Sequence, residues 1–302
     1  MTVYEVGPRD GLQNEAAPVS TADKAAFVNR LSAAGLPAIE VSAFVSPARV
    51  PAMADADALF ARIDRRPGTR YAALVPNLKG LDRARAAGVT EIAVFAAASE
   101  TFSRRNINQS IDESLQTYSG VIRAAREAGL KVRAYLSTSF GCPFEGDVPV
   151  ARVVELIGRL LDLGADEVSV SDTIGVAHPG QVRHVVRDLT AAHGVGRLAL
   201  HFHDTRGTAL ANVLAALDFG IATFDASAGG LGGCPYAPGA TGNLATEDLL
   251  YLLHGLGLDT GVDLEAVCEA SLALEPALGH RLPSRYVRAR QASRAREAHG
   301  RG

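Results

Sequence analysis

The stretch Leu198-Ala-Leu-His-Phe-His-Asp-Thr205 joins an apolar run to two histidines that stand two residues apart. Side chains alternate between the two faces of a strand, so we expect His201 and His203 to point to one face and Phe202 to the other. Taken alone, such a pair more often forms hydrogen bonds inside a core than it binds a ligand. Its meaning depends on which other polar residues the fold brings to the same face.

Apolar or alternating runs like this one recur along the chain, and each is followed by an Ala-, Leu- and Arg-rich stretch with helical spacing. Several helical stretches end in a glycine, which supplies the left-handed conformation that terminates a helix. Strict alternation of strand and helix predicts a parallel sheet, and eight such units predict a closed (β/α)8 barrel, the TIM barrel. The predicted strands are 3–6, 38–42, 71–75, 91–95, 131–137, 167–171, 198–203 and 223–227.

A doubly wound open sheet is the alternative fold. It would need a Gly-x-Gly-x-x-Gly motif after the first strand, whereas the sequence there is Gly7-Pro-Arg-Asp-Gly11. Two additional C-terminal helices, at about 246–256 and 264–277, are expected to complete a barrel domain of residues 1–285. Residues 286–302 form a basic tail, since the segment 281–302 holds seven arginines and one glutamate. A solvated helix or a frayed terminus is expected there.

The composition limits the classes of partner. The chain has 302 residues, 47% of them hydrophobic and 21% charged, which suits one barrel with a large core. A net charge of -3 argues against nucleic acid, so the expected partner is a small molecule. No run reaches the length of a membrane helix, and the first strand leaves no room for a leader. Three cysteines without C-x-x-C spacing suit a reducing compartment, and we expect a cytoplasmic protein that forms a homodimer or higher homo-oligomer.

Several polar residues are predicted to meet at the carboxyl ends of the strands, where the active site of a barrel lies. Two imidazoles, a carboxylate and an amide oxygen form a mixed nitrogen and oxygen set, which suits Mg²⁺ or Mn²⁺ better than a structural zinc. The candidates also have purely structural interpretations: a salt bridge in a turn for Arg9 and Asp10, a paired buried carboxylate for Glu40, a helix N-cap for Asp172 and an inert buried thiol for Cys234. The candidates are Arg9, Asp10, Glu40, Asp172, His201, His203, Cys234 and Asn243.

Motifs spread over nearly the whole chain, up to about residue 285, resemble the 3-hydroxy-3-methylglutaryl-CoA lyase family. The Arg-Asp pair and the His-x-His pair are shared with the wider superfamily of isopropylmalate and homocitrate synthases, whereas Gly232-Gly-Cys-Pro-Tyr-Ala237 is similar to the lyase branch. The other motifs are Glu5-Val-Gly-Pro-Arg-Asp-Gly-Leu-Gln-Asn-Glu15, Ile39-Glu-Val-Ser-Ala-Phe-Val-Ser-Pro47, Ser171-Asp-Thr-Ile-Gly175 and Gly242-Asn-Leu-Ala-Thr-Glu-Asp248.

The resemblance implies a role for each candidate. It makes Asp10, His201, His203 and Asn243 the ligands of a divalent Mg²⁺ or Mn²⁺ ion, with His201 also counted among the catalytic residues. It makes Arg9 the residue that binds and polarises the substrate, and Cys234 the catalytic cysteine of a mobile loop. Glu40, Asp172 and Glu247 match acidic positions that support the site, and we count the first two as catalytic.

The implied reaction is cleavage of an acyl-CoA with a tertiary hydroxyl, giving acetyl-CoA and acetoacetate. The hydroxyl must lose its proton, and the thioester enolate that develops must be stabilised and then protonated. An ordinary cysteine, with a pKa of about 8.5, is mostly a thiol at neutral pH and can donate that proton. A Claisen-type acyltransferase with the same site and a non-catalytic acyl-CoA sensor are the alternatives. The acyl group is left open between methylglutaryl and a longer 3-alkyl relative.

Overall fold

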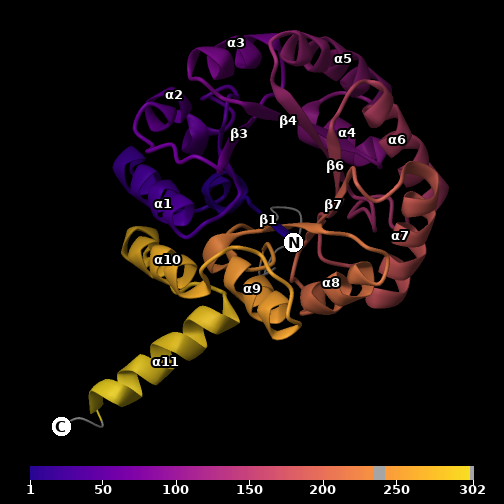
Figure 1. Ribbon diagram of the computed structural model, residues 1–302. Coiled ribbons are helices and arrows are strands. Elements are labelled where there is room, and N and C mark those ends of the chain that lie inside the picture. The colour runs from indigo at the N-terminus through magenta and orange to yellow at the C-terminus, as the bar shows by residue number, and fades with distance from the viewer. Residues whose placement is uncertain (234–241, 300–302) are drawn as a thin grey trace.

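A computed structural model describes residues 1–233 and 242–299, and these form a closed barrel of eight parallel strands in sequential order (Figure 1). The predicted (β/α)8 fold is therefore confirmed, with strand ends displaced by at most two residues. His203, predicted as the last residue of its strand, lies just beyond β7 in an isolated bridge with Asn243. The strands are β1 (Thr2–Glu5), β2 (Ala38–Ala43), β3 (Arg70–Leu74), β4 (Glu91–Ala97), β5 (Lys131–Ser137), β6 (Glu167–Asp172), β7 (Leu198–Phe202) and β8 (Thr223–Ala226).

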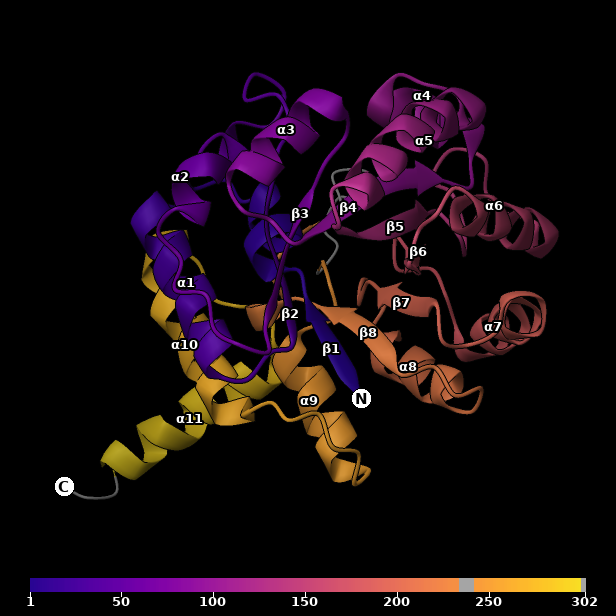
Figure 2. The ribbon, with the colours of Figure 1, turned by 45° about the horizontal axis from the view of Figure 1, so that its top comes forward.

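Helices surround the barrel, and Figure 2 shows them flanking the strands on the outside. Glycines end several of them as predicted: Gly35 has a φ of 90°, and a Cβ there would lie 2.6 Å from the carbonyl oxygen of Gly261. Only glycine fits such a corner. The surrounding helices are α1 (Thr21–Ala33), α2 (Ala56–Phe60), α3 (Leu78–Ala86), α4 (Glu100–Ile107), α5 (Ile111–Glu127), α6 (Val150–Asp162), α7 (Pro179–His193) and α8 (Ala209–Leu217).

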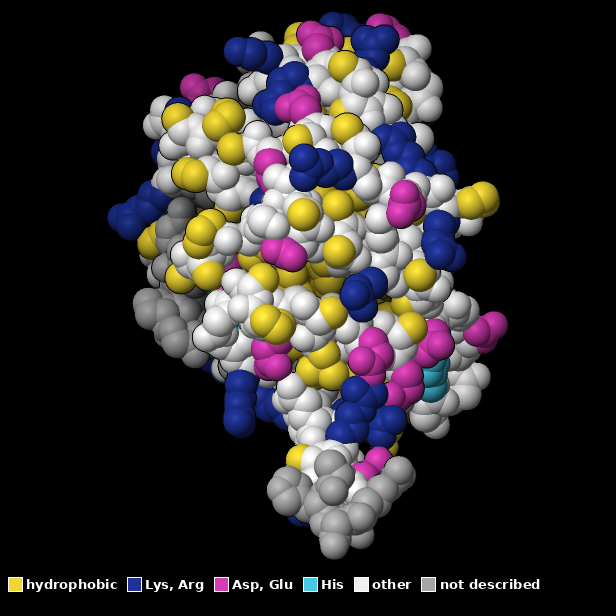
Figure 3. Space-filling view, turned by 90° about the vertical axis from the view of Figure 1, so that its left-hand side faces the viewer, with side chains coloured by type: hydrophobic (Ala, Val, Ile, Leu, Met, Phe, Trp, Pro, Cys, Tyr) yellow, Lys and Arg dark blue, Asp and Glu magenta, His cyan; other side chains and the backbone are white. Residues whose placement is uncertain are grey.

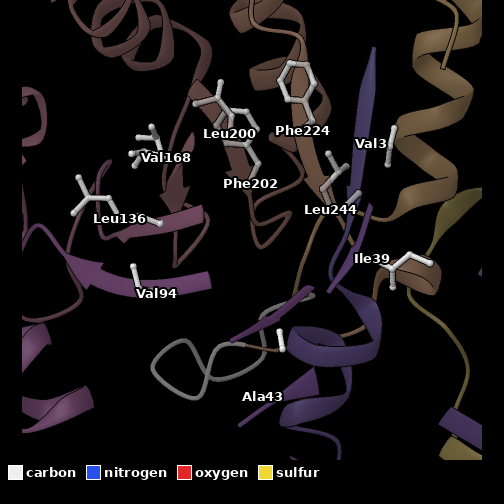
Figure 4. Packing of buried hydrophobic residues seen from close by; sticks show 14 of the residues in the cluster. Val3, Ile39, Ala43, Val94, Leu136, Val168, Leu200, Phe202, Phe224 and Leu244 are labelled. Carbon is white, nitrogen blue, oxygen red and sulfur yellow. The ribbon is translucent and has the colours of Figure 1, made fainter. Parts of the chain in front are cut away.

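The main hydrophobic core lies between the outer faces of the strands and the helices. Leu200, Phe202 and Phe224 of β7 and β8 are buried in it and lie close together in Figure 4. His201, which lies between Leu200 and Phe202, and Asp225, which follows Phe224, therefore face the barrel axis. Burying the aromatic side chains outside the barrel fixes the direction in which the polar side chains point.

The C-terminal segment continues as α9 (Thr246–Gly255), α10 (Leu264–Leu278) and α11 (Arg285–His299). Most of the predicted tail lies in the helix α11, which points away from the barrel (Figure 1). It is attached by the buried Val287 and by an ion pair from Arg290 Nε to Glu265 Oε2 at 2.9 Å. Figure 3 shows basic and acidic side chains adjacent to one another on that side of the molecule. Within the described ranges, none of the helices combines the length and apolar character needed to cross a bilayer.

Candidate active site

Arg9 and Asp10 belong to a short π-helix, η1 (Gly7–Gly11), that follows β1 directly. Arg9 is only 7% exposed and is held by two carboxylates. Its Nε donates to Glu40 Oε1 at 2.6 Å, its Nη2 donates to Glu40 Oε2 at 3.3 Å, and its Nη1 donates to Asp10 Oδ1 at 2.7 Å. Burial alone would lower the pKa of Arg9, but the two carboxylates raise it well above its ordinary value. Arg9 is a fixed positive charge.

Tyr135 on β5 completes the setting of Arg9, and the sequence analysis missed it. Its hydroxyl donates to Glu40 Oε2, and the Arg9 guanidinium lies over its ring, 5.4 Å from the centroid. Glu40 on β2 thus receives hydrogen bonds from both side chains and orients them. The alternation along β5, which places Arg133, Tyr135 and Ser137 on one face, is the sequence signal that could have identified this tyrosine.

Asp10, His201 and His203 lie together and form a candidate metal site, called the ligand cluster below: each could offer one ligand atom, and these atoms lie within 4.8 Å of one another. The two Nε2 atoms of the histidines are 3.1 Å apart. Burial, followed by the neighbouring His201, lowers the pKa of His203 to about 3. Burial would raise the pKa of Asp10, but Arg9 and then the histidines bring it down to about 2. A neutral imidazole and an ionised carboxylate are the forms that bind a metal.

Asn243, the fourth predicted ligand, lies beside this cluster. Its Nδ2 donates to Asp10 Oδ2 at 2.9 Å and to the Leu231 carbonyl at 3.0 Å. Its Oδ1 is buried, and within residues 1–233 and 242–299 no group meets the geometric criteria for a hydrogen bond to it. A buried polar atom without a partner is rare and calls for an explanation, such as a bound ion. An oxygen of this kind beside a carboxylate and two imidazoles fits a hard divalent cation.

Asp225 on β8 is a second residue that the sequence analysis missed. It pairs in register with His201 on the neighbouring strand, and its Oδ2 lies 3.2 Å from His201 Nδ1. Arg133 reaches the other carboxylate oxygen, with its Nη2 2.6 Å from Oδ1. Burial would raise the pKa of Asp225, but Arg133 and His201 together lower it. A single acidic residue inside an apolar strand has no motif around it, so the sequence offered only the alternation along β8.

The remaining acidic candidates lie outside the ligand cluster. Asp172 at the end of β6 accepts hydrogen bonds from the backbone N–H groups of Val176 and Ala177 at 2.9 and 3.1 Å, so it shapes the loop before α7. Burial raises the pKa of Asp172 to about 6. Glu247 on α9 accepts from the Gly229 N–H at 2.9 Å and from Ser271 at 2.5 Å, beneath the loop after β8. Cys234 lies outside the described residues.

A cavity of about 690 Å³ opens over Arg9 and the ligand cluster at the carboxyl ends of the strands. Arg9, Asp10 and both histidines contribute to its wall, together with apolar side chains such as Phe95 and Val75. A charged end beside an apolar wall suits a small substrate that carries both oxygen atoms and carbon branches.

The comparisons with known proteins agree with this geometry. The model of the family described as HMGL-like matches residues 1–273 of the chain. A Pseudomonas aeruginosa protein named 3-hydroxy-3-isohexenylglutaryl-CoA/hydroxy-methylglutaryl-CoA lyase is 53% identical over 95% of this chain and 96% of its own length.

Two solved structures are similar over their whole length. The Bacillus subtilis HMG-CoA lyase is 50% identical, covers 96% of this chain and 97% of its own, and superimposes with a TM-score of 0.95. An HMG-CoA lyase from Acinetobacter baumannii, solved in complex with coenzyme A and 3-methylmalate, is 39% identical over 96% of this chain and 94% of its own, with a TM-score of 0.91.

Proposed function

Because the chain belongs to the HMGL-like family, we infer its chemistry from the lyases of that family and from its own site. It is a carbon–carbon lyase that cleaves 3-hydroxy-3-methylglutaryl-CoA to acetyl-CoA and acetoacetate. The observation that carries the rest of the proposal is the cluster of Asp10, His201 and His203, with Asn243 beside it, whose buried amide oxygen has no hydrogen-bond partner among the described residues.

We propose that these four residues hold a divalent cation, Mg²⁺ or Mn²⁺, during catalysis. Four protein ligands leave two positions of an octahedron, which suit a substrate that offers two oxygen atoms. When bound, the cation would supply positive charge and Lewis acidity to the oxygens of the substrate. Both ring nitrogens of His201 are engaged, one by Asp225 and one in the ligand cluster, so we assign His201 as a ligand rather than as a free base.

Arg9 is proposed to bind the thioester oxygen of the substrate, on which negative charge develops as the enolate forms. In the reaction the C3 hydroxyl gives its proton to solvent water, the C2–C3 bond breaks to leave the C3 ketone of acetoacetate, and the electron pair of that bond passes into the thioester enolate of acetyl-CoA. Glu40 and Asp10 hold the guanidinium at the cavity wall before substrate arrives, so little reorganisation is needed in the transition state. Glu40 therefore supports catalysis by orienting Arg9, with the help of Tyr135.

Cys234 is proposed to return a proton to the C2 carbon of the enolate, on the strength of the sequence motif alone. Asp172 and Glu247 are proposed to act at one remove. Asp172 fixes the loop after β6, and Glu247 fixes the backbone at Gly229 from which the cysteine segment continues.

The substrate is an acyl-CoA, as the coenzyme A complex of the Acinetobacter baumannii relative supports. The name of the Pseudomonas aeruginosa relative includes an isohexenyl substrate, which suggests that this chain also accepts longer 3-alkyl chains. A panel of branched 3-hydroxyglutaryl-CoA esters tests this: we propose activity with methylglutaryl first and with longer chains at lower kcat/KM. The two described cysteines, Cys142 and Cys268, are free and buried, which suits the proposed reducing compartment.

Product analysis tests the proposed reaction against its alternatives. The lyase forms equal amounts of acetyl-CoA and acetoacetate from one ester, and turnover should require Mg²⁺ or Mn²⁺. An acyltransferase would instead consume acetyl-CoA and a 2-oxo acid. A sensor would bind the ester and release neither product.

A further inference from the structure

The floor of the ligand cluster is a buried chain of charged side chains. His201 Nδ1 lies 3.2 Å from Asp225 Oδ2, and Asp225 Oδ1 lies 2.6 Å from Arg133 Nη2. Ser169 Oγ donates to Asp225 Oδ2, the oxygen beside His201, at 2.8 Å. Asp225 is 1% exposed and Arg133 is also 1% exposed, so no solvent competes for these contacts.

The contact to Asp225 decides which nitrogen of His201 carries the proton. A neutral imidazole has one N–H and one lone pair, and a carboxylate can only accept a hydrogen bond. Asp225 therefore places the proton on Nδ1 and leaves the lone pair on Nε2, the atom that lies 3.1 Å from His203 Nε2 in the ligand cluster. A carboxylate behind a ligating histidine fixes both the tautomer and the plane of the ring.

Arg133 in turn holds Asp225. It extends from β5 across the barrel, with its Nε 2.9 Å from Glu167 Oε1 and its guanidinium carbon 3.7 Å from the centroid of the Tyr4 ring. A buried arginine is costly unless it is paired, and an arginine in this layer takes the place of the branched apolar side chains that usually fill a barrel. The guanidinium of Arg133 is paired in part through Nη2, which is directed at the carboxylate of Asp225, the residue that contacts His201.

We propose that Asp225 is a positioning residue for the metal site, which sets the tautomer and orientation of His201, and that Arg133 fixes Asp225 in place. This inference rests on the proposed metal site. The competing explanation is that the two residues form an ion pair that only stabilises the barrel.

Asp225→Asn separates the two explanations. Asparagine keeps the shape but has a single acceptor oxygen, so it cannot accept from both Arg133 and His201 Nδ1. If its amide faces His201, the histidine must carry its proton on Nε2 and loses the lone pair that binds metal. We expect the Kd for Mn²⁺, measured by calorimetry on metal-free protein without substrate, to rise about tenfold to a hundredfold.

Glu167→Gln is the matched control, because it removes the other carboxylate at Arg133 without touching Asp225 or His201. We expect it to lower Tm and to leave the Kd for Mn²⁺ within about twofold. An unchanged Kd in a folded Asp225→Asn variant, or an equal rise in Glu167→Gln, would overturn the inference. A native chain that binds no Mn²⁺ would overturn the proposed metal site and this inference with it.

The native chain offers a test that does not depend on the folding of a variant. With ¹⁵N-labelled histidine, long-range ¹⁵N–¹H spectra of the metal-free protein distinguish the two tautomers. We expect the resonance that disappears in a His201→Gln variant to report a proton on Nδ1. A proton on Nε2 would mean that Asp225 does not set the tautomer.

Discussion

Replacing Arg9 by lysine tests whether the shape of this side chain matters as well as its charge. Arginine has five N–H donors, and in Arg9 three of them are used by Glu40 and Asp10, which leaves two for substrate. A lysine has three donors in all, so satisfying both carboxylates leaves at most one, on a more flexible side chain without the planar fork. Losing one hydrogen bond to a charged oxygen costs about 1.5–3 kcal/mol, which corresponds to a fall in kcat of roughly ten- to 150-fold.

The assay is acetoacetate formation at saturating substrate and Mn²⁺, with the Kd for Mn²⁺ measured separately. Arg49→Lys is the matched control, since Arg49 lines the same cavity, is exposed, and undergoes the same chemical change. We expect kcat of that variant to stay within about twofold of the native value. If Arg9→Lys also stays within about twofold, Arg9 is a structural salt bridge and the proposed role in catalysis is refuted.

Three further outcomes are expected. Exhaustive chelation should abolish turnover and Mg²⁺ or Mn²⁺ should restore it, whereas full activity of metal-free protein would end the metal proposal. Cys234→Ser should lower kcat about a hundredfold or more with little change in KM, because a hydroxyl is a far weaker acid than a thiol; native kcat would remove Cys234 from the mechanism. Burial raises the pKa of Glu247 from 4.5 to about 7, so its contribution to stability is present below pH 4.5 and is lost as the pH rises through 7. In urea unfolding, the free energy of unfolding of Glu247→Gln minus that of the native chain should therefore rise by up to about 3 kcal/mol between about pH 5 and 8.5. Parallel pH curves for the two proteins would contradict the shifted pKa.

The fold could be predicted because its signals are local. Each strand is a short apolar run, and each corner between a helix and the next strand has a glycine with positive φ, as at Gly35 and Gly164. The ends of strands were less certain, as at His203, because a strand ends where its neighbour stops pairing. His203 instead forms a bridge with Asn243, which is 40 positions away in the sequence and meets His203 only in the folded barrel.

The ligand cluster could be predicted for a different reason: its members stand in recognisable motifs at the ends of strands. Tyr135, Arg133 and Asp225 were missed because they stand in no motif, and the alternation along β5 and β8 is the only sequence signal that marks them. Their partners come from other strands, and a polar residue in a strand is equally compatible with a face exposed to solvent. Only closure of the barrel shows that all three point inward.

The inward-facing polar residues connect the stability of the barrel with the chemistry at its mouth. A barrel filled by branched apolar side chains would need no ion pairs, but it would also leave Arg9 and His201 without partners from below. Here Glu40 on β2 holds Arg9, and Asp225 on β8 holds His201, so the two halves of the site are fixed by carboxylates from strands that flank β1 on either side. Each carboxylate also contacts a residue of β5, Tyr135 or Arg133, on the opposite side of the barrel. Strand β5 therefore braces both halves, and substitutions there should disturb substrate binding and metal binding at the same time.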